Sequence, residues 1–302
     1  GFYMLALTEH DQAAFVGVRS TFYRIASVIG QGGLVMLAGW LEKTCATIST
    51  AWSIVFLILS VFFLVVMVYH TWGMPSPEAD HPTPGVTART ILRDFAMTFV
   101  TFFKKPHIWS ALAFMLLYRL PEAMCVKLVV PFLKAPQAEG GLGLSTAQVG
   151  FANGTVGVVA LLVGGILGGI AISRGGLKRW LWPMALSLTL PCVFYCWLTM
   201  TLPANFPLIC TAIGVEQFGY GFGFTAFMLY LIYFSRGESQ TSHYAFCTAF
   251  MALGMMLPGM AAGWIHDYFE QMHLFGADGP QGYVNFFWWV MACCVATFAV
   301  CL

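Results

Sequence analysis

Residues 50–72 read TAWSIVFLILSVFFLVVMVYHTW and contain no Asp, Glu, Lys or Arg. About 20 mainly apolar residues are enough for an α-helix to cross the hydrocarbon core of a bilayer, so this stretch predicts a transmembrane helix. A strand is a poor alternative, because the run lacks period-two alternation and an open sheet edge cannot face lipid. The stretch therefore indicates an all-α membrane protein.

The composition of the whole chain points the same way. Hydrophobic residues make up 59% of the 302 residues and charged residues 9%, with a mean hydropathy of +0.78. Soluble domains are about 45–50% apolar and about 25% charged. The net charge of +1 gives no electrostatic support for a nucleic-acid partner. The nine cysteines form no C-x-x-C pair, which argues against a disulfide or zinc framework.

The same length criterion predicts further spans along the chain. There are eight in all, at residues 13–41, 50–72, 107–133, 145–172, 178–200, 206–235, 241–268 and 282–302. Residues 1–7 resemble the tail of a ninth span, and the chain both opens and closes inside an apolar stretch. We therefore expect an N-terminally truncated fragment with about eight of an original twelve transmembrane helices.

The longest connection between spans, residues 73–106, divides the chain. It begins with a proline-rich stretch and becomes amphipathic from Thr87 to Phe103, which predicts a helix at the membrane surface or an extension of the next span. We interpret residues 1–72 as the remnant of an N-terminal six-helix half, with the end of the fourth span and the fifth and sixth spans. Residues 73–106 are then a cytoplasmic linker, and 107–302 the C-terminal six-helix half.

Lys and Arg residues in the loops predict the orientation. With span 13–41 counted as the fifth, loops after even-numbered spans carry eight Lys and Arg residues, and loops after odd-numbered spans carry Lys43 and Lys134. Because cytoplasmic loops are enriched in Lys and Arg, we expect the even-numbered loops to face the cytoplasm.

Ionisable residues inside spans are the candidate functional residues, since a charge in the membrane is costly. Arg119 and Glu122 are three residues apart and share a helix face, and Pro121 between them frees a backbone carbonyl and favours a kink. A broken helix with two charges is typical of a transport site. The alternative is a structural ion pair. Tyr23, Arg24, Tyr118, Lys127 and Gln217 complete our predicted substrate-binding set.

Glu216 is a different case, because it has no opposite charge within a helical turn. In an apolar span a carboxyl group without a cation favours its neutral form, the property that a proton carrier needs. We therefore predict that Glu216 couples transport to protons. The alternative is a protonated glutamic acid hydrogen-bonded to Gln217 or to a neighbouring helix.

Other patterns predict packing rather than chemistry. Gly164, Gly165, Gly168 and Gly169 recur at helical spacing, and a second group of glycines follows Glu216 at spacing two; both favour close helix contacts. His266, Glu270 and neighbouring residues could bind a metal ion, but the sequence shows no third ligand, so we expect no metal site and no cofactor.

The segment Gly169-Ile-Ala-Ile-Ser-Arg-Gly-Gly-Leu-Lys178 resembles the loop signature G-x-x-x-D-R-x-G-x-[RK] of the major facilitator superfamily. Gly169, Arg174, Gly176 and Lys178 match it, and Ser173 replaces the Asp. The segments Tyr23-Arg24, Tyr118-Arg-Leu-Pro-Glu-Ala123 and Glu216-Gln-Phe218 are similar to the muropeptide permease (AmpG-like) branch, with Pro121 for Gly and Glu122 for Asp.

This resemblance implies a major facilitator fold and proton-linked import of anhydromuropeptides across the bacterial inner membrane. We expect a secondary transporter by alternating access, not an enzyme, with partners limited to a small anionic solute, protons and the lipid bilayer. We also expect a monomer that binds no nucleic acid. Alternatives are a transporter of acetyl-CoA or another organic anion, a membrane-embedded acyltransferase, and a non-transporting sensor.

The predicted orientation can be tested by single-cysteine labelling in a cysteine-free background. An impermeant reagent applied from outside should label Gly279→Cys but not Ser76→Cys, because we expect residue 76 to lie in a cytoplasmic loop and 279 in an outer one. Labelling of position 76 alone would show that the orientation is inverted.

Overall fold

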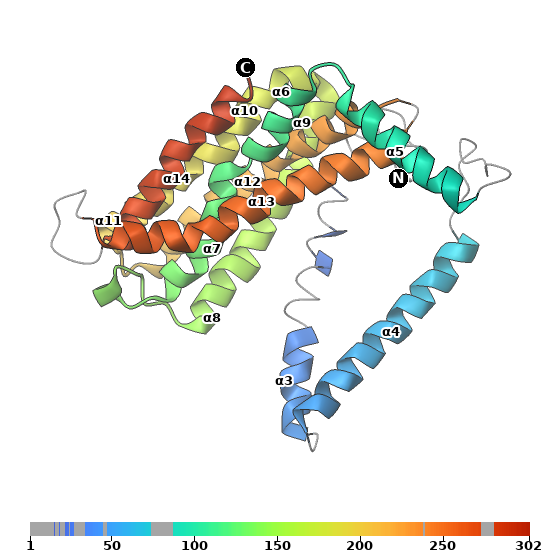
Figure 1. The fold of residues 1–302 in the computed structure, drawn as a ribbon. Coiled ribbons are helices and arrows are strands. Elements are labelled where there is room, and N and C mark those ends of the chain that lie inside the picture. The colour runs from blue at the N-terminus through green and yellow to red at the C-terminus, as the bar shows by residue number, and fades with distance from the viewer. Residues whose placement is uncertain are drawn as a thin grey trace.

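The computed structural model describes residues 34–44, 47–73, 87–237, 239–272 and 281–302, together with six isolated residues between 15 and 26. Within these residues the chain is helical and contains no strand. The helices, labelled as in Figure 1, are α3 (Leu34–Thr44), α4 (Ile48–Gly73), α5 (Ala88–Phe103), α6 (Ile108–Leu117), α7 (Leu120–Lys134), α8 (Thr146–Val149), α9 (Val158–Gly175), α10 (Leu177–Thr189), α11 (Val193–Thr201), α12 (Phe206–Ser235), α13 (Gln240–Glu270) and α14 (Gly282–Ala299). The expected all-α membrane fold is confirmed.

Six stretches of the described chain are long and apolar enough to cross a membrane. They coincide with six of the eight predicted spans: 49–73, 150–175, 177–201, 206–235, 240–270 and 282–299. Two of them are composite, because a π-helical segment, Gly150–Gly157, leads into α9, and a 3₁₀ turn, Leu190–Cys192, joins α10 to α11.

The structure of the other two predicted spans differs from a single continuous helix or is only partly described. Span 107–133 is present as two helices, α6 and α7, that meet at a break, so neither reaches membrane length alone. Span 13–41 lies mostly outside the described residues, apart from α3 at its end. The division of the chain into two six-helix halves remains a prediction.

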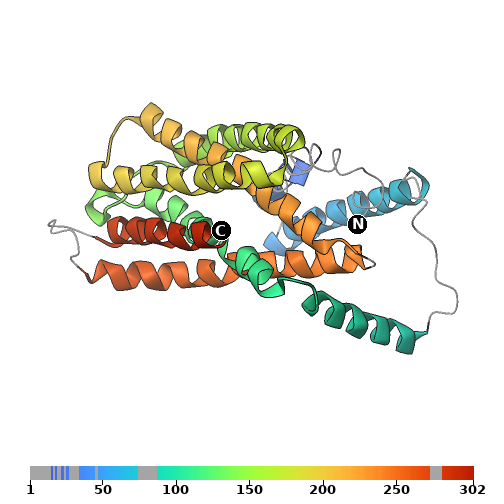
Figure 2. The same ribbon diagram turned by 90° about the horizontal axis from the view of Figure 1, so that it is seen from above.

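The centre of the bundle is α12, which packs against α9 and α10, while α7 packs against α13 and α14 (Figures 1 and 2). Helices α3 and α4 contact each other and lie apart from this bundle in Figure 1. Nearly all of α4 is exposed: only 11% of the residues in its most apolar stretch are buried. Its apolar surface matches that of a helix whose solvent is lipid.

Glycines allow α12 to lie close to both of its neighbours. A Cβ atom on Gly164 of α9 would collide with the carbonyl oxygen of Phe218, and one on Gly221 would collide with that of Leu161. Gly219 and Gly223 contact the backbone of α10 instead. Spacing of two residues turns a helix by about 200°, so alternate glycines face opposite neighbours. The prediction that these glycines serve helix packing is confirmed.

The amphipathic segment is a separate helix, α5, and not an extension of the next span. His107, just before α6, has a left-handed backbone with φ of 57°, which separates the two helices. The end of α5 docks on α13, where Phe102 is fully buried and the Nε2 atom of His243 lies 3.2 Å from Thr101 Oγ1. The amphipathic pattern predicted this helix correctly.

Lys105 joins the same region to the end of α12. Its Nζ atom donates hydrogen bonds of 2.6 Å to the carbonyl oxygens of Phe234 and Arg236. A cation at a helix C-terminus stabilises carbonyl groups that no helical N–H can reach. Partial burial lowers the pKa of the Lys105 ammonium from its usual value.

The close crossing of α9 and α12 leads to a prediction about the stability of the protein. Gly164→Ala should lower the melting temperature of the purified protein, because the new methyl group overlaps a backbone oxygen and overpacking costs about 1–3 kcal/mol. Gly263→Ala on α13 is the matched control, since nothing lies within 4 Å of its Cβ position. Equal melting temperatures for the two variants would show that the helices can separate without cost.

Candidate functional site

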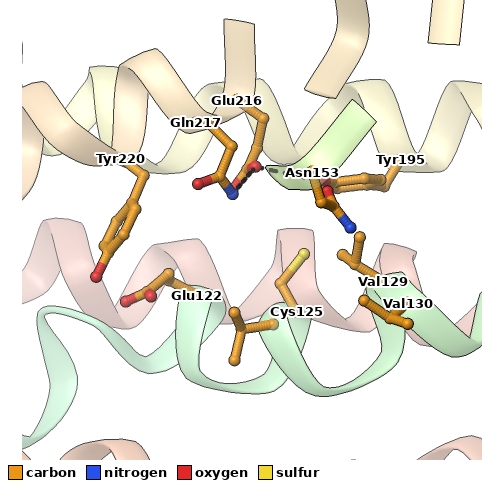
Figure 3. A pocket seen from close by; sticks show the side chains of 10 residues that line it. Glu122, Cys125, Val129, Val130, Asn153, Tyr195, Glu216, Gln217 and Tyr220 are labelled. Atoms are coloured by element: carbon orange, nitrogen blue, oxygen red, sulfur yellow. Dashed lines mark hydrogen bonds between the residues drawn. The ribbon is translucent and has the colours of Figure 1, made fainter. Parts of the chain in front are cut away.

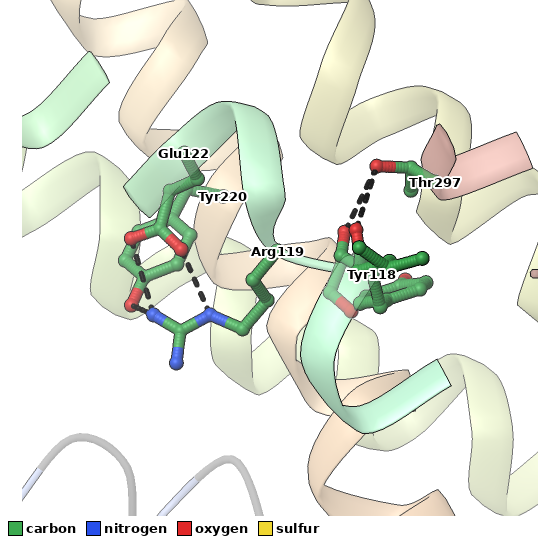
Figure 4. A network of polar contacts seen from close by, with 7 residues as sticks. Tyr118, Arg119, Glu122, Tyr220 and Thr297 are labelled. Atoms are coloured by element: carbon green, nitrogen blue, oxygen red, sulfur yellow. Dashed lines mark hydrogen bonds and ion pairs between the residues drawn. The ribbon is translucent and has the colours of Figure 1, made fainter. Parts of the chain in front are cut away.

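The first membrane passage of the bundle is broken between α6 and α7. Arg119 has backbone angles of −105° and 13°, outside the helical region. Pro121 has no N–H to donate to Leu117, four residues earlier, so that carbonyl loses its helical partner. Thr297 of α14 replaces it: its Oγ1 atom donates to the oxygens of Tyr118 at 3.1 Å and Leu117 at 3.4 Å (Figure 4). The predicted kink is therefore a complete break, stabilised from another helix.

Arg119 and Glu122 form a buried two-point ion pair at this break. Arg119 Nε lies 2.8 Å from Glu122 Oε2, and Nη2 donates to Oε1 at 3.1 Å. Nη2 also donates to the hydroxyl of Tyr220 at 2.8 Å (Figure 4). The two residues are 6% and 5% exposed. Paired donors facing paired acceptors give a strong, directional contact, which is the geometry by which arginine also binds other carboxylates.

Aromatic rings surround the guanidinium group. Its central carbon lies 4.5 Å from the centre of the Phe224 ring, 5.5 Å from Tyr220 and 5.9 Å from Phe227. These faces attract a cation that burial has removed from water. Glu122 lies in the first turn of α7, where the helix dipole favours a negative charge. Both charges are therefore supported independently of each other.

Glu216 forms a second polar centre on α12, about one and a half turns before the middle of the glycine group. The hydroxyl of Tyr195 donates to its Oε2 atom at 3.1 Å, and Gln217 Nε2 donates to the same oxygen at 2.8 Å (Figure 3). Glu216 is 5% exposed. One oxygen of this buried carboxyl group therefore accepts hydrogen bonds from two side chains on different helices.

One cavity of about 90 Å³ connects the two centres. Glu122, Cys125 and Val129 of α7 face Glu216, Gln217 and Tyr220 of α12 across it (Figure 3). A single water needs about 10–15 Å³ of such space, so several waters fit. Two carboxyl groups from different helices, one of them paired with an arginine, thus meet in a polar chamber inside an apolar bundle.

The structure brings together only some of the predicted site residues. Arg119, Glu122, Glu216 and Gln217 surround the cavity or its ion pair. Tyr118 instead stacks on Phe227, and its hydroxyl donates to the oxygen of Gly223 at 3.1 Å.

Three predicted residues lie away from the cavity or cannot be placed. Lys127 is exposed and close to Gly259 of α13. Tyr23 is 69% exposed, and Arg24 lies outside the described residues.

The loop signature forms the turn between α9 and α10. Gly176 has a φ of 75°, a left-handed value that a residue without a Cβ adopts easily, and Gly169 is buried in α9. Arg174 and Lys178 are exposed. This turn lies at the far end of α9 from the cavity, so the signature shapes a loop and does not line the site.

Among the cavity residues that sequence reasoning missed, three carry a hydroxyl or amide group. Tyr220 follows Glu216 by one helical turn and could have been found from that spacing. Asn153 is an amide within an apolar span, and it lies on the π-helical segment, a feature frequent at functional sites. Tyr195 gave no signal, because its contact with Glu216 depends on how α11 packs against α12.

A cluster of possible metal ligands lies at the C-terminal end of α13, the end away from α5. Ligand atoms of His266, Asp267 and Glu270 lie within 4.8 Å of one another, and His266 Nδ1 is 3.2 Å from an oxygen of Asp267. Both carboxylates are exposed, and such groups are common without an ion. His273, three residues after Glu270, lies outside the described residues.

Comparison with known proteins gives a consistent result. The chain is 26% identical over 262 residues to the anhydromuropeptide permease of Escherichia coli K12, covering 85% of this chain and 49% of that protein. It is 23% identical over 231 residues to a protein called transporter AmpG 4 from Rickettsia conorii, covering 76% and 52%. The chain is thus similar to proteins named as permeases or transporters of the AmpG type, as the resemblance of its segments implied.

The chain spans about half the length of the curated relatives it matches first. An uncharacterised protein of Haemophilus influenzae is 21% identical over 296 residues, 94% of this chain. No protein-family model matches. The relatives and the six membrane-length helices of the described residues together indicate a multi-pass membrane protein, as the composition predicted.

Proposed function

We propose that the protein is a secondary transporter of the inner membrane that moves a small anionic solute of the anhydromuropeptide type by proton-coupled alternating access. The observation that carries this proposal is the cavity where the Arg119–Glu122 pair and Glu216 meet. Charged groups are kept inside membrane spans chiefly where they serve transport. The name of the Escherichia coli relative supplies the solute class.

Arg119 is the proposed binding group for a carboxylate of the solute. Its guanidinium already holds a carboxylate, Glu122, through two nitrogens in the described conformation. An incoming carboxylate with the same geometry can take the place of Glu122, because the exchange keeps the number of charged hydrogen bonds unchanged. Glu122 would then face the cavity without its cation. Solute binding and the Arg119–Glu122 ion pair are linked by this competition.

Glu216 is the proposed proton carrier. Tyr195 and Gln217 stabilise its charged form through the same oxygen, while the apolar surroundings stabilise its neutral form. A carrier must exchange its proton with the two sides of the membrane in turn, which requires that neither form be strongly preferred. Waters in the cavity can carry protons between Glu216 and Glu122. The second half of the transporter would close the cavity on the other side as the halves rock.

The proton role predicts the behaviour of Glu216→Gln in the full-length protein. The amide keeps the size and most of the hydrogen bonding but cannot ionise. Accumulation of radiolabelled anhydromuropeptide driven by an imposed pH gradient should be lost, while solute binding stays within about threefold of the unaltered protein. Gln217→Glu in the same background tests whether a nearby carboxyl group restores accumulation. Normal accumulation by Glu216→Gln rejects the proton role.

The binding role predicts a graded series at Arg119. Arg119→Ala should weaken solute binding roughly tenfold to more than a hundredfold, because losing one charged hydrogen-bond partner typically costs about 1.5–3 kcal/mol. Arg119→Lys should restore it only in part, since lysine lacks the two-point geometry. Binding is measured by isothermal titration on purified full-length protein.

A purely structural ion pair predicts the opposite pattern. Arg119→Ala would then lower the melting temperature by leaving Glu122 buried and unpaired, and adding Glu122→Ala would restore it. Unchanged solute affinity in that double variant would contradict the binding role of Arg119. Loss of affinity in a double variant with a normal melting temperature supports it.

A further inference from the structure

A second hollow, of about 290 Å³, lies at the membrane-surface end of α9 and the start of α10. It is far along α9 from the cavity between the two carboxyl groups, and it is open to the outside of the bundle. Its wall contains the side chains of Leu167, Ile170, Ala171, Arg174, Arg179 and Trp180. The transport site uses none of these residues, so the hollow needs an explanation of its own.

One side of the hollow is an apolar stripe that ends in a charge. Leu167, Ile170, Ala171 and Arg174 follow the spacing of three, four and seven residues that places side chains on one helix face. Leu167 is 45% and Ile170 39% exposed, so this face is open to the lipid around the bundle. The seven residue steps from Leu167 to Arg174 cover roughly 10 Å along the helix.

The charged end holds two arginines that no acid neutralises. Arg174 and Arg179 are exposed, and neither has an ion-pair or hydrogen-bond partner within the part of the chain that the structure describes. Ser173 stands where the loop signature has an aspartate, and its hydroxyl donates to the oxygen of Ile170 at 2.9 Å. The replacement removes the carboxylate that would otherwise be nearest to Arg174. Two cations beside one hollow therefore attract an external anion.

Trp180 fixes the far wall of the hollow. Its indole nitrogen lies against Gly175, where a Cβ atom would collide with the ring, and the ring meets Phe222 edge-on at 5.9 Å. The tryptophan is thus held by packing, and not by a polar partner. Tryptophan prefers the depth of the lipid headgroups, because one part of its ring is apolar and its N–H can reach water or a headgroup.

We propose that this hollow binds the headgroup of an anionic phospholipid. Arg174 and Arg179 hold the phosphate, Trp180 borders the glycerol, and the first carbons of an acyl chain lie along Leu167 and Ile170. Arginine suits phosphate because its planar donors match the oxygens. The apolar stripe favours a lipid over a free phosphate, which has nothing to place there. The predicted cytoplasmic orientation of this loop is also the side on which anionic lipids gather.

This inference does not depend on the transported solute, so its test is a binding measurement. The protein is extracted from nanodiscs that contain phosphatidylglycerol and phosphatidylcholine, and native mass spectrometry counts the phosphatidylglycerol that remains bound. Arg174→Gln with Arg179→Gln should reduce this retention on the order of tenfold or more. Lys178→Gln is the matched control: Lys178 is an exposed cation beside the same arginines but does not line the hollow, so retention should stay within about twofold.

Two further arms separate a lipid from its headgroup. Ala171→Phe keeps both arginines but fills the apolar part of the hollow, and it should also reduce retention. Glycerol 3-phosphate added in millimolar excess should not displace the lipid. Equal retention by the double arginine variant, equal loss with Lys178→Gln, or displacement by glycerol 3-phosphate would each overturn the proposal. Retention is compared only among variants whose melting temperatures match that of the unaltered protein, which excludes loss of fold as the cause of reduced retention.

Discussion

A charge inside the membrane must be compensated by the protein itself, and the Arg119–Glu122 pair is where this chain meets that requirement most directly. The pair exists because the first passage of the bundle is broken at Arg119, which lets a helix start place Glu122 against the guanidinium. Thr297 satisfies the carbonyls that the break exposes, so the broken backbone can lie inside an apolar bundle. Without the Arg119–Glu122 pair and the Thr297 hydrogen bonds, this membrane passage would be a continuous helix that carries no site.

The glycines of α12 are the second requirement, since they let α9 and α10 pack closely on the helix that carries Glu216. Each of its close crossings uses the absence of a side chain on one face: Gly221 toward α9, and Gly219 and Gly223 toward α10. Lipid gives helices no hydrophobic reason to associate, so close packing of small residues must do so. The same helix carries Glu216 and Tyr220 toward α7, and the packing thereby creates the polar cavity.

The two ends of α9 serve different environments. Its π-helical approach brings Asn153 to the polar cavity, whereas its last turn presents Arg174 to the membrane surface. Between them runs a helix whose one face packs on α12 and whose other face is exposed and apolar. A single span thus links an interior site to the lipid boundary.

The sequence alone determined the helical membrane fold, because spans of apolar residues are set by bilayer thickness, and it predicted a kink at Pro121, because proline has no N–H. It also identified Arg119, Glu122 and Glu216, since charges in apolar spans are conspicuous. Only the tertiary structure decided that Tyr195 and Asn153 line the same cavity as Glu216, and that Lys127 lies outside it. Those contacts cross between helices far apart in the chain. Their geometry depends on interhelical packing, which residue spacing along one helix does not specify.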